Sequence, residues 1–359
     1  MLMSFDVRFI DKSLSDHCGA TNSCAHNLRI LTKSTGMSPT NKIRKDFHKF
    51  YANQLEMTAV DVFVCFHPAS MCELYMPFNR SIIVIASTRY ELGRFKPNEW
   101  KKWNSNLKII AENPRNLIAA NNLYDAEYIR YFTGLNVTLL PSFCKYTNVQ
   151  YNPQRDEFLL APIHHRYFES TFLKLLNHSI NQFSKKKIIV ARIRDIYRYY
   201  RYSDLANHSA IIHVPYQVSI MSLFEQYQMG IPLIFPSLNL LTEWHYKFGV
   251  VNERSWDNVN YGKKCNASNI NGVFSNIPDP NNDFDRNAIK YWLNFSDFYQ
   301  WPHIIYYESF DDLVHRLHTT DFNMISVKMK IYSSQVKQML LEKWRGILTN
   351  IKKNSNKFH

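Results

Sequence analysis

Residues 210–236, AIIHVPYQVSIMSLFEQYQMGIPLIFP, constrain the fold more than any other part of the chain. Two short apolar runs, beginning at Ile211 and Ile231, flank a segment whose apolar side chains recur at i, i+3, i+4 and i+7. Gly230 stands where the C′ residue of a helix is expected, and the proline two positions later is tolerated at the start of a strand. The stretch therefore predicts a buried strand, an amphipathic helix and a second buried strand, which is the repeating unit of a parallel α/β sheet.

The same alternation of apolar runs and amphipathic segments continues on both sides of this stretch. We predict further strands at 5–10, 61–68, 81–88, 107–113, 117–122, 137–142, 157–163, 186–193 and 303–309, and helices at 41–56, 125–132, 168–183, 288–301, 310–318 and 333–352. A polar, proline-bearing segment at 144–156 is typical of a linker. The fold class predicted is α/β, with two Rossmann-like doubly wound domains facing a cleft and a long C-terminal helix. The predicted boundaries are 1–148, 149–332 and 333–359.

The composition narrows the classes of partner. The chain has 359 residues, 45% of them hydrophobic, which suits two globular domains. Its net charge is +13, but the basic residues are dispersed and no RRM, zinc-finger or basic-zipper pattern occurs, so we expect no nucleic-acid partner. An anionic small substrate explains the charge equally well. No apolar run is long enough to span a membrane.

The compartment is not readable from the sequence. The N-terminus lacks the pattern of a signal peptide, so the chain as it stands indicates a cytoplasmic protein. An anchor upstream of this chain would instead allow the lumen of the Golgi or the ER.

Two clusters of metal-ligand residue types are interpreted as ordinary loops. His17, Cys18, Cys24 and His26 lie close together, but their spacing matches no zinc module. The Asp283-Phe284-Asp285 triplet lies in a proline-rich loop, away from any predicted nucleotide strand. We therefore expect no metal and no cofactor. The six cysteines are irregularly spaced, which indicates no disulfide framework, and Cys65, inside an apolar run, is interpreted as a buried thiol.

Polar residues follow several predicted strands, where an open α/β sheet places its chemistry. His67 follows the strand at 61–68 and is the candidate general base; Arg89 and Glu91 follow the next strand and are candidates for the acceptor side. Arg192 and Arg194 follow a strand of the second half, and guanidinium groups suit a diphosphate. A structural histidine and solvated surface arginines are the alternative interpretations.

Specific segments resemble glycosyltransferases of the GT-B type. NNLYDAEYIRYFTG with NVTLLPS resembles the end of a GT-B N-terminal domain, and EFLLAPI resembles the first strand of the donor domain. Residues 213–237 resemble the segment that carries a glutamate on a helix before a Gly-x-Pro strand. The resemblance implies that Glu225 holds the ribose of a nucleotide sugar and that the turn from Ser219 to Ser222 cradles the diphosphate. His213, Tyr216 and Gln217, just before the helix, are further candidate ligands.

The resemblance implies a glycosyltransferase that moves a sugar from a nucleotide sugar to a glycan, protein or small-molecule acceptor without a metal. One departure is that Gln217 stands where retaining families often carry a second glutamate, so a mechanism of that type is in doubt. Two alternatives stay open: a sugar-nucleotide epimerase of the same architecture, and a non-catalytic basic binding protein on this scaffold. For Glu225, an ordinary solvated helix glutamate is the other interpretation.

Overall fold

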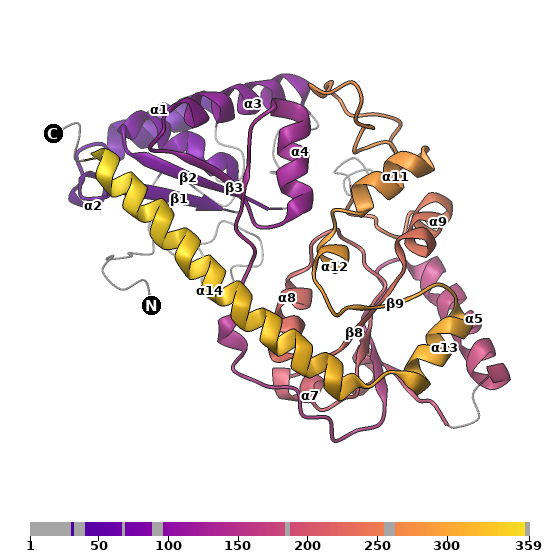
Figure 1. Ribbon diagram of the computed structural model, residues 1–359. Helices are drawn as coiled ribbons and strands as arrows, with labels where there is room; N and C mark the ends of the chain where they lie inside the picture. The colour runs from indigo at the N-terminus through magenta and orange to yellow at the C-terminus, as the bar shows by residue number, and fades with distance from the viewer. Residues whose placement is uncertain are drawn as a thin grey trace. The chain divides into compact units, whose positions relative to one another are not determined.

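The computed structural model describes residues 30–31, 40–66, 69–87, 96–183, 187–254 and 263–355. The chain forms two compact units, each with its own parallel sheet (Figure 1). The N-terminal unit comprises the described residues up to Pro141, with Asn269–Phe274 and those from Leu340 on. The C-terminal unit comprises Ser142–Ser268 and Ser275–Met339, again within the described ranges. The prediction of an α/β protein with two parallel, Rossmann-like sheets and a long C-terminal helix is confirmed.

The sheet of the N-terminal unit has the order β1-β2-β3-β4, with every pairing parallel. Its strands are β1 (Val62–Phe66), β2 (Ser81–Ala86), β3 (Leu117–Ala120) and β4 (Thr138–Leu139). The helices of this part are α1 (Asn41–Tyr51), α2 (Leu55–Thr58), η2 (Ala69–Leu74), η3 (Met76–Phe78), α3 (Pro97–Glu112) and α4 (Leu123–Thr133). The described strands thus follow one another across the sheet in chain order. The strand predicted at 5–10 lies outside the described residues.

The strand predicted at 107–113 is wrong, because these residues form the second half of α3. Pro97 begins this helix, at a position where its missing N–H costs nothing. Trp100, Trp103, Leu107 and Ile110 are buried at helical spacing, whereas Ile109 is 53% exposed. The adjacent pair of isoleucines resembled a strand, but only one of them faces the core.

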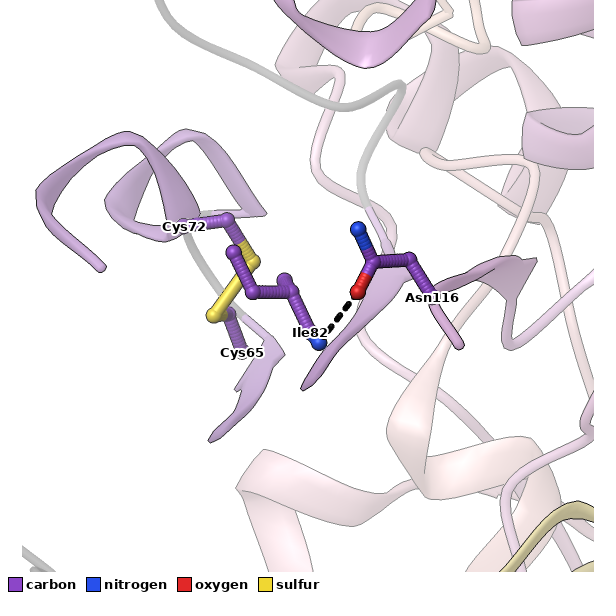
Figure 2. Close-up of a disulfide and its surroundings, with 4 residues drawn as sticks. All are labelled: Cys65, Cys72, Ile82 and Asn116. Carbon is purple, nitrogen blue, oxygen red and sulfur yellow. Dashed lines mark hydrogen bonds between the residues drawn. A yellow bond between two sulfur atoms is a disulfide. The ribbon is translucent and has the colours of Figure 1, made fainter. Parts of the chain in front are cut away.

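A disulfide joins the end of β1 to the 3₁₀ helix that follows it. Cys65 lies in β1 and Cys72 in η2, and their sulfur atoms are bonded, with Cα atoms 5.7 Å apart (Figure 2). The interpretation of Cys65 as a free buried thiol is therefore wrong: Cys72, seven residues later in η2, lies at bonding distance. Figure 2 also shows the Asn116 side-chain oxygen accepting the Ile82 N–H at 2.8 Å, beside the start of β2.

The sheet of the C-terminal unit has the order β6-β5-β7-β8-β9, again all parallel. Its strands are β5 (Phe158–Leu160), β6 (Val190–Arg192), β7 (Ile211–Ile212), β8 (Leu233–Pro236) and β9 (Ile305–Tyr307). The helices of this unit are η5 (Lys145–Thr147), α5 (Arg166–Phe183), α6 (Ile193–Ile196), α7 (Tyr202–Ala206), α8 (Met221–Met229), α9 (Leu238–Phe248), α11 (Arg286–Leu293), α12 (Asp297–Gln300) and α13 (Phe310–Thr319). From β5 the chain steps to β6 on one side, then crosses back to β7 on the other. This sheet is doubly wound.

Residues 210–236 form the strand, helix and strand that their pattern predicts. In α8, Leu223, Phe224 and Tyr227 are buried, and the helix ends at Gly230, whose φ of 76° lies in the left-handed region. The following β8 is buried throughout, as expected for a strand covered on both faces. The spacing of apolar residues in this stretch and their burial in the structure therefore agree.

The last helix, α14 (Phe322–Ser355), begins before the predicted residue 333. Asp321 precedes it, and its carboxylate accepts the Met324 N–H at 2.9 Å, which satisfies one of the free donors of the first turn. None of the helices that the structure describes combines the length and apolar character needed to cross a bilayer.

Candidate functional site

The strand order of the C-terminal unit reverses at β5, which pairs with both β6 and β7. The chain leaves the carboxyl end of β5 through residues 161–165 into α5, and the carboxyl end of β7 through residues 213–220 into α8. Because the two connections run to different sides, a crevice at the carboxyl edge is the usual ligand site of such a sheet. The candidate site is built from the side chains at this switch point.

Four side chains meet at the switch point. The rings of His164, after β5, and Tyr216, after β7, are in contact, with centroids 3.9 Å apart and planes tilted by 34°. The Gln217 amide donates a hydrogen bond to the Glu253 carboxylate, and the Glu253 N–H donates to the Tyr216 carbonyl at 2.9 Å. An aromatic pair beside a carboxylate and an amide offers a surface for stacking and hydrogen bonding a nucleotide base.

Partial burial, and not the surrounding charges, favours a neutral His164 ring. Burial lowers the pKa of His164, and the nearby Arg194 guanidinium lowers it further, while the Glu253 carboxylate acts in the opposite direction. Burial, followed by the charge of Glu253, raises the pKa of Tyr216. At neutral pH the pair therefore presents two uncharged rings, which suits stacking better than anion binding.

The start of α5 completes this edge. His165 Nδ1 accepts the Phe168 N–H at 3.2 Å, so the imidazole caps the helix through its unprotonated nitrogen. The first turn belongs to an 18-residue helix, and the dipole of such a helix favours an anion at its N-terminus. Glu169 lies in the same turn, 3.7 Å from Arg192 and 4.0 Å from Arg194, so the potential offered to a phosphate here comes from the helix dipole and these arginines together.

The two arginines predicted as diphosphate ligands differ in their surroundings. Arg192, the last residue of β6, donates from Nε to Asp195 at 2.6 Å, and its Nη1 lies 3.7 Å from Glu169. Arg194 lies 4.0 Å from Glu169 and is more exposed. Arg194 is therefore the less constrained of the two and the one whose charge reaches His164.

Glu225 lies in the middle of α8 among tyrosines. Its Oε1 accepts hydrogen bonds from the Tyr146 hydroxyl at 2.6 Å and from the Tyr202 hydroxyl at 2.8 Å. Burial and the Glu225 carboxylate together raise the pKa of Tyr202 to about 12. Two phenols converging on one oxygen distinguish Glu225 from an ordinary solvated helix glutamate and leave its second oxygen for a ligand.

The remaining predicted ligands lie around the start of α8. Ser219 and Ser222 are half-buried on either side of its first residue. His213 is 5% exposed, stacks on Phe235 with centroids 4.7 Å apart, and its Nε2 is hydrogen-bonded to the Gln226 side chain at 2.8 Å. Burial lowers the pKa of His213 to about 4. This ring offers little surface to a ligand and belongs to the core beneath the site.

Several predicted residues lie outside the part of the chain that the structure describes. They are His67, Arg89 and Glu91, together with the His/Cys cluster from His17 to His26. Their roles stay predictions.

The Asp-x-Asp triplet takes part in a buried network. Asp283 is fully buried and paired with Arg254, which also donates to the carbonyls of Pro280 at 2.6 Å and Asn282 at 2.9 Å. The Arg254 guanidinium and the hydrogen bond from His245 hold the pKa of the Asp283 carboxyl below its usual range, against the opposing effect of burial. Asp285 caps α11. Both carboxylates are engaged in folding the loop, and no three His, Cys, Asp or Glu side chains among the described residues are placed to hold a metal ion.

A polar depression lies at the opposite edge of the sheet, before the starts of β5 and β7. Its lining includes Arg155, Asp156, Ser209 and Asp321. Since parallel sheets carry their ligands at the carboxyl edge, we assign no function to this depression.

The sequence reasoning missed His164, His165 and Glu253 at the switch point. The two histidines follow the strand predicted at 157–163, so the strand-end rule that selected His67 would also have selected them. Glu253 carried no such signal, because it reaches the site from the connection after α9. Tyr146 and Tyr202, which bind Glu225, were likewise unreadable from their positions.

Comparison with known proteins leaves the family open. No protein-family model and no curated protein matches the chain. Among solved structures, TarM aligns with 11% identity over 85% of this chain and 58% of its own, at a TM-score of 0.46. CalG4, the calicheamicin glycosyltransferase, aligns with 9% identity over 86% of this chain and 77% of its own, at a TM-score of 0.39. The chain thus spans less than two thirds of TarM. These likenesses are too distant to carry an argument about activity, which depends on the site itself.

Proposed function

We propose that the protein is a glycosyltransferase that uses a nucleotide sugar, with the nucleotide bound at the carboxyl edge of the C-terminal sheet. The observation that carries the proposal is the reversal of strand order at β5, with the His164 and Tyr216 rings in contact directly at that edge. An apolar stacking surface next to a helix N-terminus matches the two halves of a nucleotide, its base and its phosphates.

Different residues of the site would bind different parts of the nucleotide-sugar donor. His164 and Tyr216 stack on the base, and Gln217 with Glu253 offers hydrogen bonds to its edge. Glu225, held by its two tyrosines, binds the ribose hydroxyls through its second oxygen.

The diphosphate would occupy the start of a helix. Ser219 and Ser222 flank the first residue of α8, and the start of α5 and Arg194 supply positive potential nearby. These groups stabilise the charge that develops on the departing diphosphate, which is the role a metal ion plays in other transferases. We accordingly propose a metal-independent reaction. His67 as general base, and Arg89 and Glu91 as acceptor ligands, complete the proposal from the sequence.

Nucleotide binding is the first test. The full chain is heated with UDP, GDP or ADP and with their sugars, each in large excess. A ligand at about 100 times its dissociation constant stabilises the folded state by about 2.7 kcal/mol, which a thermal-shift assay resolves. Absence of a shift with every nucleotide would refute both the transferase and the epimerase.

Two variants then locate the site. Tyr216→Ala removes the stacking ring, and Glu225→Gln keeps an acceptor for both tyrosines while removing the charge offered to the ribose. Each should weaken the nucleotide by about tenfold, the effect of losing roughly 1.4 kcal/mol. Glu99→Gln, at an exposed ion pair on α3, is the matched control. If it weakens binding as much as Glu225→Gln does, the ribose assignment is wrong.

The products separate the remaining alternatives. Transfer of the sugar to an acceptor, or its release to water, identifies a transferase, whereas inversion at C2 of the intact sugar nucleotide identifies an epimerase. Nucleotide binding without either reaction would identify the non-catalytic binding protein.

A further inference from the structure

An exposed group of tyrosines and arginines lies beside Glu225. The segment that follows β6 reads IYRYYRY from Ile196 to Tyr202. In it, Tyr199 is 84% exposed and Tyr200 49% exposed, and Tyr146 of η5 is 57% exposed. Large aromatic rings gathered on a surface commonly mark an interaction site, because burying their exposed apolar area against a partner is favourable. We call Tyr146, Arg198, Tyr199, Tyr200 and Arg201 the tyrosine surface.

This surface is continuous with Glu225. The Tyr146 and Tyr202 rings lie 6.4 Å apart, and both hydroxyls donate to the same carboxylate oxygen. The charge of Glu225 also contributes, after burial, to the raised pKa of Tyr200. The exposed rings therefore extend outward from the residue that the proposed function assigns to the donor.

The surface is positively charged. Arg198 is exposed, and its guanidinium lies 5.7 Å from the centre of the Tyr199 ring. The nearest carboxylates along the chain are otherwise engaged: Asp195 accepts from Arg192, and Asp204 accepts the N–H of Arg201. Within this segment both carboxylates are thus engaged by neighbouring groups, although Asp195 is itself exposed, while Arg198 and Arg201 are exposed.

We propose that the tyrosine surface binds an anionic oligosaccharide, and that this oligosaccharide is the acceptor. The proposal rests on the proposed function. Tyrosine rings pack against the apolar C–H faces of pyranose rings, and their hydroxyls exchange hydrogen bonds with sugar hydroxyls. Guanidinium groups bind carboxylate or sulfate groups through two parallel hydrogen bonds. An anionic oligosaccharide therefore offers binding groups to both the tyrosines and the arginines of the surface.

A single-stranded nucleic acid also has stackable rings and negative charge, but fits this surface less well. Such strands are held along a basic groove that follows several successive phosphates. Here the two exposed arginines alternate with tyrosines in one short segment next to Glu225. Two arginines in one short segment match the few charged groups of a short oligosaccharide, and not a run of successive phosphates.

Calorimetric titration of the full chain at low salt tests the proposal. The probes are a chondroitin sulfate hexasaccharide, the neutral chitohexaose, and a 12-nucleotide oligo(dT). The sulfated hexasaccharide is expected to bind at least about tenfold more tightly than the neutral one, because loss of the guanidinium contacts removes roughly one charge-assisted hydrogen-bonded pair. Equal binding of the two sugars, or tighter binding of oligo(dT), would overturn the proposal.

Variants locate the binding. Tyr199→Ala and Arg198→Ala should each weaken the sulfated hexasaccharide by about fivefold, and Tyr199→Phe should restore most of the loss because it keeps the ring. Tyr291→Ala on α11 and Lys174→Ala on α5 are controls for a tyrosine and a basic residue elsewhere on the same unit. If the controls weaken binding equally, the sugar binds by net charge alone.

The two proposals can fail separately. Tyr199→Ala should leave the thermal shift caused by nucleotides unchanged, because Tyr199 lies outside the donor site. If nucleotides bind and the sulfated hexasaccharide does not, the acceptor assignment is wrong and the transferase stands. If the hexasaccharide binds but no nucleotide does, the proposed function fails, and with it the role of this sugar as acceptor.

Discussion

Lowering the pH from 7 to 5 should destabilise the C-terminal unit through one side chain, His213. The ring is fully surrounded by the core, stacked on Phe235 and hydrogen-bonded to Gln226, and burial lowers its pKa to about 4. In the unfolded chain its pKa returns to about 6.5. Between these values the unfolded state binds a proton that the folded state does not, so the free energy of unfolding falls as the pH falls.

The size of the effect follows from the two pKa values. The full difference corresponds to about 3 kcal/mol, of which about 2 kcal/mol is lost between pH 7 and 5. Two other buried histidines, His208 and His245, and the more exposed His164 also have lowered pKa values and add to the slope. The contribution of His213 is therefore measured as a difference from the His213→Gln variant, which cannot titrate.

Native-state hydrogen exchange is the suitable assay, because a chain with two compact units need not unfold in a single step. The amides of β7 and β8 are followed at pH 7, 6 and 5 in both proteins, with exchange rates corrected for pH. Wild type should lose about 2 kcal/mol more than His213→Gln over this range. Equal slopes would show that the proton enters His213 in the folded state without penalty, which would refute its burial as the cause.

Three further changes test the packing. Arg254→Ala leaves a buried carboxylate unpaired and should cost about 3–5 kcal/mol in urea unfolding, whereas Arg286→Ala, at an exposed ion pair, should cost at most about 1 kcal/mol; similar costs would contradict the first assignment. Gly230→Ala and Gly249→Ala each place a side chain at a positive φ, which should lower the free energy of unfolding by about 1–2 kcal/mol. Only at Gly230 would the new Cβ also meet a lysine of α14, so Gly230→Ala should cost more. Equal losses of stability in the two variants would refute that crowding. Cys72→Ala should lower the stability of the N-terminal unit by about 2–3 kcal/mol, as for a short closed loop, and an unchanged urea midpoint would argue against the disulfide.

The elements that the sequence predicted correctly are those whose signal is local. The strand, helix and strand of residues 210–236 have a helical repeat, a glycine at the left-handed C′ position and continuous apolar strands, all within one short window. The prediction of a strand at 107–113 was wrong because its local signal was misleading. Its two adjacent isoleucines satisfied a strand pattern, and only the burial of Trp100 and Trp103 earlier in the same helix shows that the period is helical.

The candidate site was only partly predictable. The rule that ligands gather at the ends of strands selected the stretch before α8 and Glu225 as candidates, because both depend on position within one strand–helix unit. The pairing partners of Glu225 did not follow, since Tyr146 and Tyr202 come from separate segments and nothing in their own neighbourhoods indicates a carboxylate.

By itself, the sequence determined the class of the fold, the presence of two parallel sheets and the helix on which Glu225 lies. These features depend on the spacing of apolar residues along the chain, which the sequence shows directly. Only the tertiary structure decided where the sheet of the C-terminal unit reverses, that His164 meets Tyr216 there, and that Asp283 pairs with Arg254. These features depend on strand order and on contacts between distant segments. Such contacts are selected by the packing of the whole unit and leave no periodic trace in the sequence.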